Sequence, residues 1–230
     1  DENFARGIAN FTEKHLKKEF HLTLSKFVHE IRNPVALISS ELQLMASAHP
    51  KLCSYEQWDS LMDNLEYIKE LLNEFSDYNN AEKISPVPVN INEFLNTIIS
   101  CEKTTMSYLG ITLETHMEEI HDKVLLDRVK MRQALLNLLR NACESIEQPK
   151  GKIIVSLTRE QNKICISIKD NGCGMTDEQR EKIFSPFVSY KTAGTGLGLA
   201  VTKDIILAHK GSIDVISSPG HGSTFRIFLG

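Results

Sequence analysis

A histidine, a glutamate and an asparagine lie close together in the run Phe27-Val28-His29-Glu30-Ile31-Arg32-Asn33-Pro34. Imidazole can act as an acid, a base or a nucleophile near neutral pH. Asn33 lies four residues after His29 and therefore shares its face of a helix. A lone surface histidine is usually only solvated, but Pro34 is unusual inside a helix and favours a kink there. The run is therefore a candidate functional site, but these residues alone do not establish a function.

Two asparagines, Asn137 and Asn141, lie four residues apart within a predicted helix, so both side chains point the same way. An amide oxygen is a hard ligand of the kind that Mg²⁺ prefers alongside waters and phosphates. For this pair alone, ordinary polar helix surface is the simpler interpretation.

Two glycine-containing runs follow. In the first, 170–174, Asp170 follows a strand that ends at Lys169 and precedes Gly172 and Gly174, which permit a tight turn. A buried carboxylate there could accept a hydrogen bond from the amino group of a base. The second run, 194–198, leads into a helix whose first amides and dipole favour a polyphosphate. It is neither a Walker motif nor G-x-G-x-x-G, and each run is a weak signal by itself.

Hydrophobic patterning predicts the elements that would position these groups. Helices are expected over 91–108, 127–146 and 197–208, and strands over 111–115, 124–126, 152–158, 163–169, 212–216 and 223–229. Asp127 should cap the second helix. Its buried side is expected to comprise Val129, Leu135, Leu136, Leu138 and Leu139. A turn at Gln161-Asn162 should join two of the strands into a hairpin. These elements predict a two-layer α/β sandwich with a mostly antiparallel sheet.

The first part of the chain carries two heptad seams, which predict an α-helical hairpin. One seam comprises Leu24, Val28, Ile31, Val35, Ile38, Leu42 and Met45, and the other comprises Trp58, Leu61, Leu65, Ile68, Leu72 and Phe75. A homodimer with a four-helix bundle is the natural completion, and a hairpin packed on its own second domain is the alternative. We therefore expect a hairpin at 1–83, a Pro-containing linker at 84–90 and a second domain at 91–230.

Composition excludes several classes of function. The 230 residues carry a net charge of −4, which argues against nucleic-acid binding through bulk electrostatics. Five scattered cysteines indicate a reduced, cytoplasmic protein. The sequence shows no membrane-spanning run and begins at Asp1 without a methionine. We expect a fragment whose longer parent would reach a membrane only through upstream segments.

Taken together, the motifs closely resemble the catalytic core of sensor histidine kinases, within the ATPase superfamily shared with gyrase and certain chaperones. The resemblance rests on the helix asparagines, the Asp170 turn, Phe184-Ser185-Pro186-Phe187, Gly194-Thr195-Gly196-Leu197-Gly198-Leu199 and Gly220-His221-Gly222-Ser223-Thr224-Phe225, in that order. His-Glu-Ile-Arg-Asn-Pro at 29–34 is similar to the phosphoacceptor box of that family. The short segment at Ser189-Tyr190-Lys191 is similar to the nitrogen-regulation and sporulation-type kinases.

The resemblance implies a role for each matching residue. His29 would attack the γ-phosphate of ATP, Glu30 would act as its base, and Asn33 would orient water for dephosphorylation of a response regulator receiver domain. Asn141 would bind Mg²⁺ with Asn137 beside it, and Asp170 would receive the adenine amino group. Further residues would complete the nucleotide site: Gly172 and Gly174 at the adenine, Arg140 and Lys191 as phosphate cations, and Gly194, Thr195, Gly196, Leu197 and Gly198 below a mobile lid at about 175–193.

Two other functions remain open on the sequence. One is a catalytically silent, nucleotide-binding dimeric scaffold, which would bind ATP without labelling any histidine. The other is an ATPase clamp, which would not need the heptad hairpin with its exposed His29. The motifs favour the kinase, but they leave open the signal, the cognate regulator and whether phosphorylation occurs within or between subunits.

Overall fold

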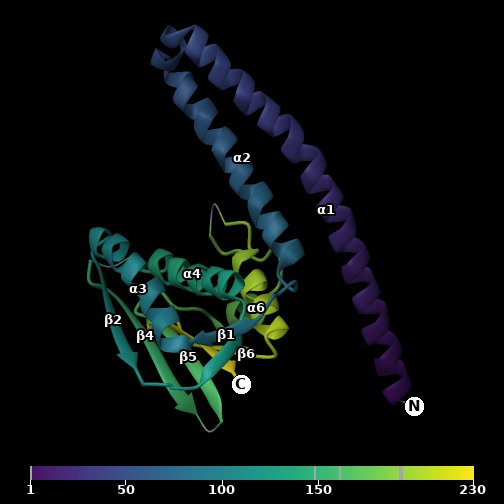
Figure 1. Ribbon diagram of the computed structural model, residues 1–230, viewed down its shortest axis with the longest axis vertical. Coiled ribbons are helices and arrows are strands. Elements are labelled where there is room, and N and C mark those ends of the chain that lie inside the picture. Colours follow the sequence, from purple (N-terminus) through teal and green to yellow (C-terminus); the bar gives the residue numbers. More distant parts are fainter. Residues whose placement is uncertain (1, 148, 161, 192–193) are drawn as a thin grey trace. The chain divides into compact units, whose positions relative to one another are not determined.

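The computed structural model describes residues 2–147, 149–160, 162–191 and 194–230 (Figure 1). Contacts divide the chain into two compact units, one ending at Asn80 and the other beginning at Ala81. No helix in the described part of the chain combines the length and the apolar character that a membrane crossing requires.

The first unit is a helical hairpin. Helix α1, Glu2–Ala48, continues through Pro34, and a 3₁₀ turn at Pro50–Ser54 leads into α2, Glu56–Asn80. Both expected helices are therefore present. Between the two helices the hairpin core contains Val28, Val35, Leu65 and Leu72, all buried, with Leu24, Ile31, Leu42 and Phe75 packed against them.

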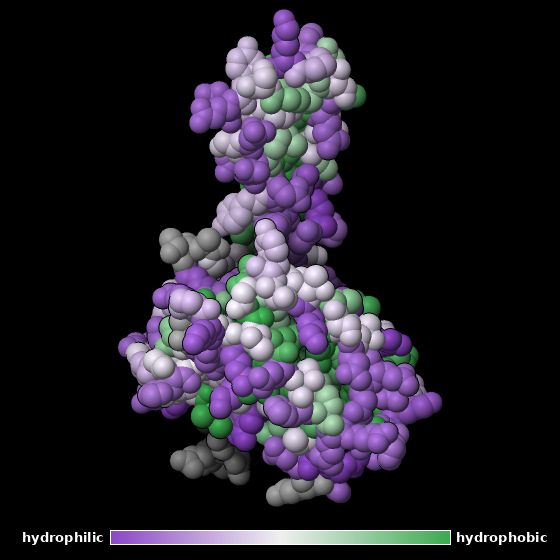
Figure 2. All heavy atoms as spheres, turned by 90° about the vertical axis from the view of Figure 1, so that its left-hand side faces the viewer, coloured by the Kyte–Doolittle hydropathy of each residue, from purple (hydrophilic) through white to green (hydrophobic). Residues whose placement is uncertain are grey.

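The two seams are only partly used by the hairpin. Ile38, Met45, Leu61 and Ile68 belong to the seams, yet each exposes between 39% and 49% of its surface in the single chain. Figure 2 shows apolar side chains gathered along the hairpin between polar ones. The seams therefore close the hairpin with most of their residues, while these four seam residues remain largely exposed.

The second unit is a two-layer α/β sandwich, as predicted. Its helices are α3 (Ile91–Tyr108), α4 (Arg128–Glu144), α5 (Asp177–Lys182) and α6 (Gly198–Ala208). Its strands are β1 (Val87–Asn90), β2 (Ile111–Met117), β3 (Lys123–Leu126), β4 (Gly151–Glu160), β5 (Lys163–Asp170), β6 (Ser212–Ser217) and β7 (Ser223–Leu229). The main sheet has the order β2-β4-β5-β7-β6, in which only the β2–β4 pair is parallel. Helices α3, α4 and α6 cover one face of it (Figure 1).

The segment expected to link the two parts contributes to the second unit. Strand β1 pairs antiparallel with β3, and the Asn90 side chain accepts hydrogen bonds from the amides of Asn92 and Glu93 to cap α3. Asp127 caps α4 in the same way, through the amides of Val129 and Lys130. Capping carboxylates and amides satisfy donors that would otherwise lack partners.

One expected core residue is exposed. Val129 leaves 76% of its surface accessible, whereas Met131, Leu135 and Leu138 of the same helix are buried. Position 129 lies two residues before Met131, which places it about 200° around the helix from the buried stripe. The prediction that Val129 faces the core was therefore wrong, and Met131 takes that place.

The strand register sets up the core. Val155, Ile168 and Phe225 face one another across β4, β5 and β7, as do Leu157, Ile166 and Ile227 in the next row. All six are at least 95% buried. Because side chains alternate along a strand, Asp170 lies on this same inward side, two residues beyond Ile168. A carboxylate therefore lies at the end of a row of apolar side chains. Gln161 of the expected β4–β5 turn lies outside the described residues.

Candidate nucleotide and phosphoacceptor sites

Asp170 is a buried carboxylate with one oxygen left open. Only 3% of its surface is accessible. Its Oδ1 accepts hydrogen bonds from the amides of Gly172 (2.8 Å) and Ser223 (3.1 Å) and from the Ser145 hydroxyl (3.2 Å). Its Oδ2 accepts none from the described residues. A buried acceptor without a donor is costly, so this oxygen is suited to a ligand's amino group.

Burial raises the pKa of Asp170 above its ordinary value, against the lowering effect of the donors from Gly172, Ser223 and Ser145. Desolvation disfavours the charged form, and hydrogen bonds to the carboxylate favour it. A donor on Oδ2 would therefore add to the stabilisation of the ionised form.

The turn after Asp170 has room only for glycine at two positions. A Cβ on Gly172 would lie 2.1 Å from the Ser145 hydroxyl oxygen, and one on Gly174 would lie 2.0 Å from the Ser218 carbonyl oxygen. Gly174 also has φ +68°, which favours glycine. The amide of Cys173 donates to the Ser145 carbonyl (2.9 Å), so the turn lies directly against the end of α4.

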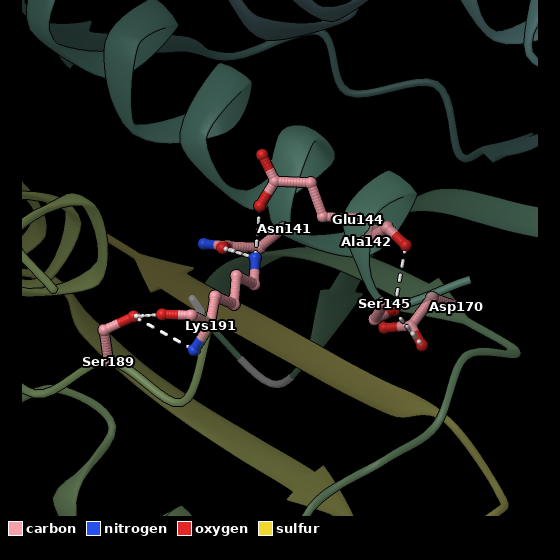
Figure 3. A network of polar contacts seen from close by, with 7 residues as sticks. All are labelled: Asn141, Ala142, Glu144, Ser145, Asp170, Ser189 and Lys191. Atoms are coloured by element: carbon pink, nitrogen blue, oxygen red, sulfur yellow. Dashed lines mark hydrogen bonds and ion pairs between the residues drawn. The ribbon is translucent and has the colours of Figure 1, made fainter. Parts of the chain in front are cut away.

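Helix α4 presents a polar row toward the glycine run. The Asn137 amide donates to the Gly198 carbonyl (3.1 Å), which joins α4 to the first residue of α6. Asn141 lies one turn further on, and its Oδ1 faces the segment at 189–191 (Figure 3). Arg140 is exposed and forms no ion pair with the residues that the structure describes.

Lys191 already contacts the expected metal ligand. Its ammonium donates to Asn141 Oδ1 (2.8 Å) and forms a close ion pair with Glu144 (Figure 3). The Ser189 hydroxyl accepts from the Lys191 amide (3.1 Å) and donates to the Lys191 carbonyl (3.2 Å), which fixes the local turn. The structure thus brings Lys191 and Asn141 together, although they are 50 residues apart in sequence.

The second glycine run leads into α6. The Thr195 hydroxyl accepts from the amide of Leu197 (3.3 Å), Leu197 is fully buried, and Gly196 lies against the backbone of Val188. Helix α6 begins at Gly198 without a side-chain cap. Uncapped amides at a helix start favour an anion. Gly194 lies at the other end of the run, against Ser189.

These residues fit a nucleotide with a divalent cation. Asp170 Oδ2 suits a base amino group, the start of α6 suits phosphates, and the Asn141 amide oxygen with the nearby Glu144 carboxylate suits Mg²⁺. No cluster of three or more histidine, cysteine, aspartate or glutamate side chains able to hold a metal occurs among the described residues. A cation here would therefore depend on ligands from phosphates and water.

His29 lies on α1, in the first unit. Val28 beside it is buried in the hairpin, whereas His29, Glu30 and Asn33 are exposed. Arg32 spans the hairpin, since its guanidinium donates to the Leu72 carbonyl of α2 (3.3 Å). A small cleft beside the histidine is lined by Ser25, Val28, His29, Arg32, Ser76, Asn79 and Asn80. The phosphoacceptor candidate is therefore accessible on the outer side of a packed hairpin.

Two residues of the candidate nucleotide site, Ser145 and Glu144, were not predicted from the sequence. Ser145 continues the helical row of Asn137 and Asn141 at a further four residues, so extension of that spacing would have found it. Glu144 lies three residues after Asn141 on the same helix face, but its contact with Lys191 could not be predicted, because Lys191 is distant in sequence.

Comparison with known proteins places these features in a family. Residues 126–230 match the family model described as histidine kinase-, DNA gyrase B-, and HSP90-like ATPase. The signal transduction histidine-protein kinase AtoS of Escherichia coli is 30% identical over 202 residues, which cover 87% of this chain and 33% of AtoS. Sporulation kinase B of Bacillus subtilis is 31% identical over 204 residues, which cover 87% of this chain and 47% of the relative. The chain thus spans a third to a half of the length of these relatives.

Solved structures agree. The catalytic domain of histidine kinase ThkA has a TM-score of 0.58 at 29% identity. The match covers 64% of this chain and 95% of that domain. Full-length ShkA in complex with AMPPNP has the same fold, with a TM-score of 0.77 at 22% identity over 90% of this chain and 45% of ShkA. Residues 126–230 therefore belong to the ATPase family described as histidine kinase-, DNA gyrase B-, and HSP90-like, and most of the chain is similar to proteins named as histidine kinases.

Proposed function

We propose that this chain autophosphorylates on His29 and passes the phosphoryl group to an aspartate of a response regulator. The buried Asp170 carries the proposal, because its Oδ2 has no donor among the described residues and an adenine amino group would supply one. The turn at Gly172 and Gly174 closes around it. Asn141 would hold Mg²⁺, which would neutralise phosphate charge when bound.

The chemistry requires a neutral histidine with a free lone pair. His29 Nε2 attacks the γ-phosphorus of ATP, the bond from that phosphorus to the bridging oxygen breaks, and ADP leaves with the electron pair. Glu30 accepts the proton from Nδ1 as the imidazole gains positive charge. The product is a phosphoramidate, from which the phosphoryl group passes to a regulator carboxylate. Arg140 and the Lys191 ammonium are the candidate cations for the transferred phosphate.

We further propose that two chains pair through the hairpin. The exposed seam residues Ile38, Met45, Leu61 and Ile68 form an apolar face that a single hairpin leaves in water. A second copy presents the same residues, so the two hairpins would form a four-helix bundle.

A regulator partner is supported by a relative. Histidine kinase ThkA, which is 24% identical and has a TM-score of 0.62, has been solved in complex with response regulator protein TrrA. Exposure of His29 on the hairpin would allow a receiver domain to reach the phosphoryl group. Exposed Asn33, four residues on, would orient the water that dephosphorylates the regulator.

Labelling tests the kinase proposal. Purified chain incubated with Mg²⁺ and ATP labelled at the γ-phosphate should acquire an acid-labile, base-stable label. His29→Gln should abolish the label, whereas His49→Gln, at another exposed hairpin histidine, should keep it. Label persisting in His29→Gln would contradict the assignment, and tight ATP binding without any label would favour a silent scaffold. Asn33→Ala should keep the label but lose regulator dephosphorylation.

A further inference from the structure

The contact between Lys191 and α4 places a cation on two oxygens. Asn141 Oδ1 accepts from the Lys191 ammonium at 2.8 Å, and the Glu144 carboxylate pairs with the same ammonium. Asn141 and Glu144 lie three residues apart, so their side chains leave the same face of the helix (Figure 3). The Lys191 side chain is 42% exposed and that of Glu144 is 45% exposed, so the group is open to exchange with solutes.

This arrangement has the chemistry of a cation site. An amide oxygen and a carboxylate are both hard ligands that suit Mg²⁺. The proposed function assigns Asn141 Oδ1 to that ion, but the Lys191 ammonium donates to the same oxygen in this structure. An ammonium and a divalent cation repel each other and need the same lone pairs, so they cannot occupy these oxygens together.

We propose that Asn141 and Glu144 form one cation seat, which the Lys191 ammonium holds without nucleotide and Mg²⁺ holds with it. The inference rests on the proposed function and adds Glu144 as a second protein group at the metal. Arrival of the nucleotide with its cation displaces Lys191, which is then available to pair with phosphate. Cation binding and release of the segment at 189–191 are thereby coupled through a shared pair of oxygens.

The coupling is measured by titrating Mg²⁺ at a fixed concentration of ADP and following ADP binding. ADP avoids the γ-phosphate, to which Lys191 could itself contribute. Lys191→Met removes the competitor, so the half-saturating Mg²⁺ concentration should fall about threefold, as expected for a half-exposed ion pair. Adding Glu144→Gln to Lys191→Met should raise that concentration again by about threefold. Glu147→Gln in the same background, an exposed carboxylate three residues on, should leave it unchanged.

A second measurement needs no nucleotide. Hydrogen exchange of the backbone amides at 185–191 should accelerate most in Lys191→Met, which loses both contacts, and less in Glu144→Gln, which keeps the hydrogen bond from Lys191 to Asn141. The double variant should exchange at the rate of Lys191→Met. Glu147→Gln should exchange at the wild-type rate.

The outcomes distinguish failure of the proposed cation seat from failure of the proposed kinase function. Equal half-saturating Mg²⁺ concentrations in Lys191→Met and in its double variant with Glu144→Gln would overturn the role of Glu144. If Lys191→Met has the same half-saturating Mg²⁺ concentration as wild type, Lys191 does not compete with Mg²⁺. A wild-type chain that binds no ADP at all would overturn the proposed function, whereas normal ADP binding with unchanged concentrations would overturn the seat alone.

Discussion

The hydroxyl of Ser145, at the C-terminal cap of α4, donates a hydrogen bond of 3.2 Å to Oδ1 of Asp170 at the end of β5. This contact joins the helix that carries Asn137 and Asn141 to the strand that carries the buried carboxylate. Because Ser145, Gly172 and Ser223 all donate to Oδ1, the carboxylate is fixed in orientation and Oδ2 is presented to the ligand side.

Asp170→Asn should weaken nucleotide binding while leaving the fold intact. An asparagine oxygen can still accept from the three donors, but the amide nitrogen then replaces Oδ2 and faces the amino group of a base, donor against donor. We expect a loss of about 100-fold in ATP affinity, measured by calorimetry, since a hydrogen bond to a charged group is worth about 1.5–3 kcal/mol.

The same substitution has a predictable effect on stability. Burial raises the pKa of Asp170, so the ionised carboxylate costs stability that is regained as the pH falls toward the unfolded value of about 3.9. Asp170→Asn should remove this dependence. The melting temperature of the variant minus that of wild type should therefore be larger at pH 7 than at pH 4. A smaller difference at pH 7 than at pH 4 would contradict the direction of the shift.

Gly172→Ala should destabilise the second unit, because its Cβ would lie 2.1 Å from the Ser145 hydroxyl and 2.5 Å from the Ser145 carbonyl oxygen. Displacing the end of α4 should cost about 1–3 kcal/mol in urea unfolding. Gly198→Ala is the matched control, since its Cβ would meet only the Asn137 amide at 3.8 Å, an ordinary contact. Equal losses of stability in the two variants would exclude the close approach at Ser145 as the cause.

Sequence patterning predicted most helices and strands of the second unit because their apolar periods match the burial observed, but it did not predict the short strand β1 or the short helix α5. It also placed Asn141 within the helix that is α4, Asp170 at the end of the strand that is β5 to within one residue, and the second glycine run directly before α6. It could not place Lys191 on Asn141, since that contact is made by a loop whose path depends on tertiary structure. It misplaced Val129, because a short apolar run at a helix start does not reveal which residue of the first turn faces the sheet.

Asp127→Asn should loosen the attachment of the segment before β1. Asp127 Oδ1 caps α4, while Oδ2 accepts from the Ser85 amide at 2.7 Å. An asparagine keeps the cap but turns an amide nitrogen toward Ser85, so the free energy of unfolding at pH 7 should fall by about 1–2 kcal/mol.

The pH dependence of this effect has a defined sign. Burial raises the pKa of Asp127, but the amides of Ser85, Lys130 and Val129 and the nearby His209 together bring it below its ordinary value. The stabilisation is therefore present above the unfolded value of about 3.9 and is lost as the pH falls through the lower folded value. The difference in urea unfolding between wild type and variant should be largest at pH 7 and should narrow as the pH falls below about 4. A difference that grows as the pH falls would contradict the direction of the shift.

Ile38→Asp should convert a dimer into a monomer. Ile38 exposes 48% of its surface in the single chain and belongs to the seam face that we propose a second copy covers. A charge buried in that interface lacks a partner, which is more costly than leaving the apolar face in water. Sedimentation velocity should show the halved mass, and circular dichroism should show that the α/β unit is retained. Leu44→Asp is the control, because Leu44 is 69% exposed and lies outside both seams, so it should remain dimeric. If Leu44→Asp is monomeric and Ile38→Asp is still dimeric, the interface lies on the other side of α1.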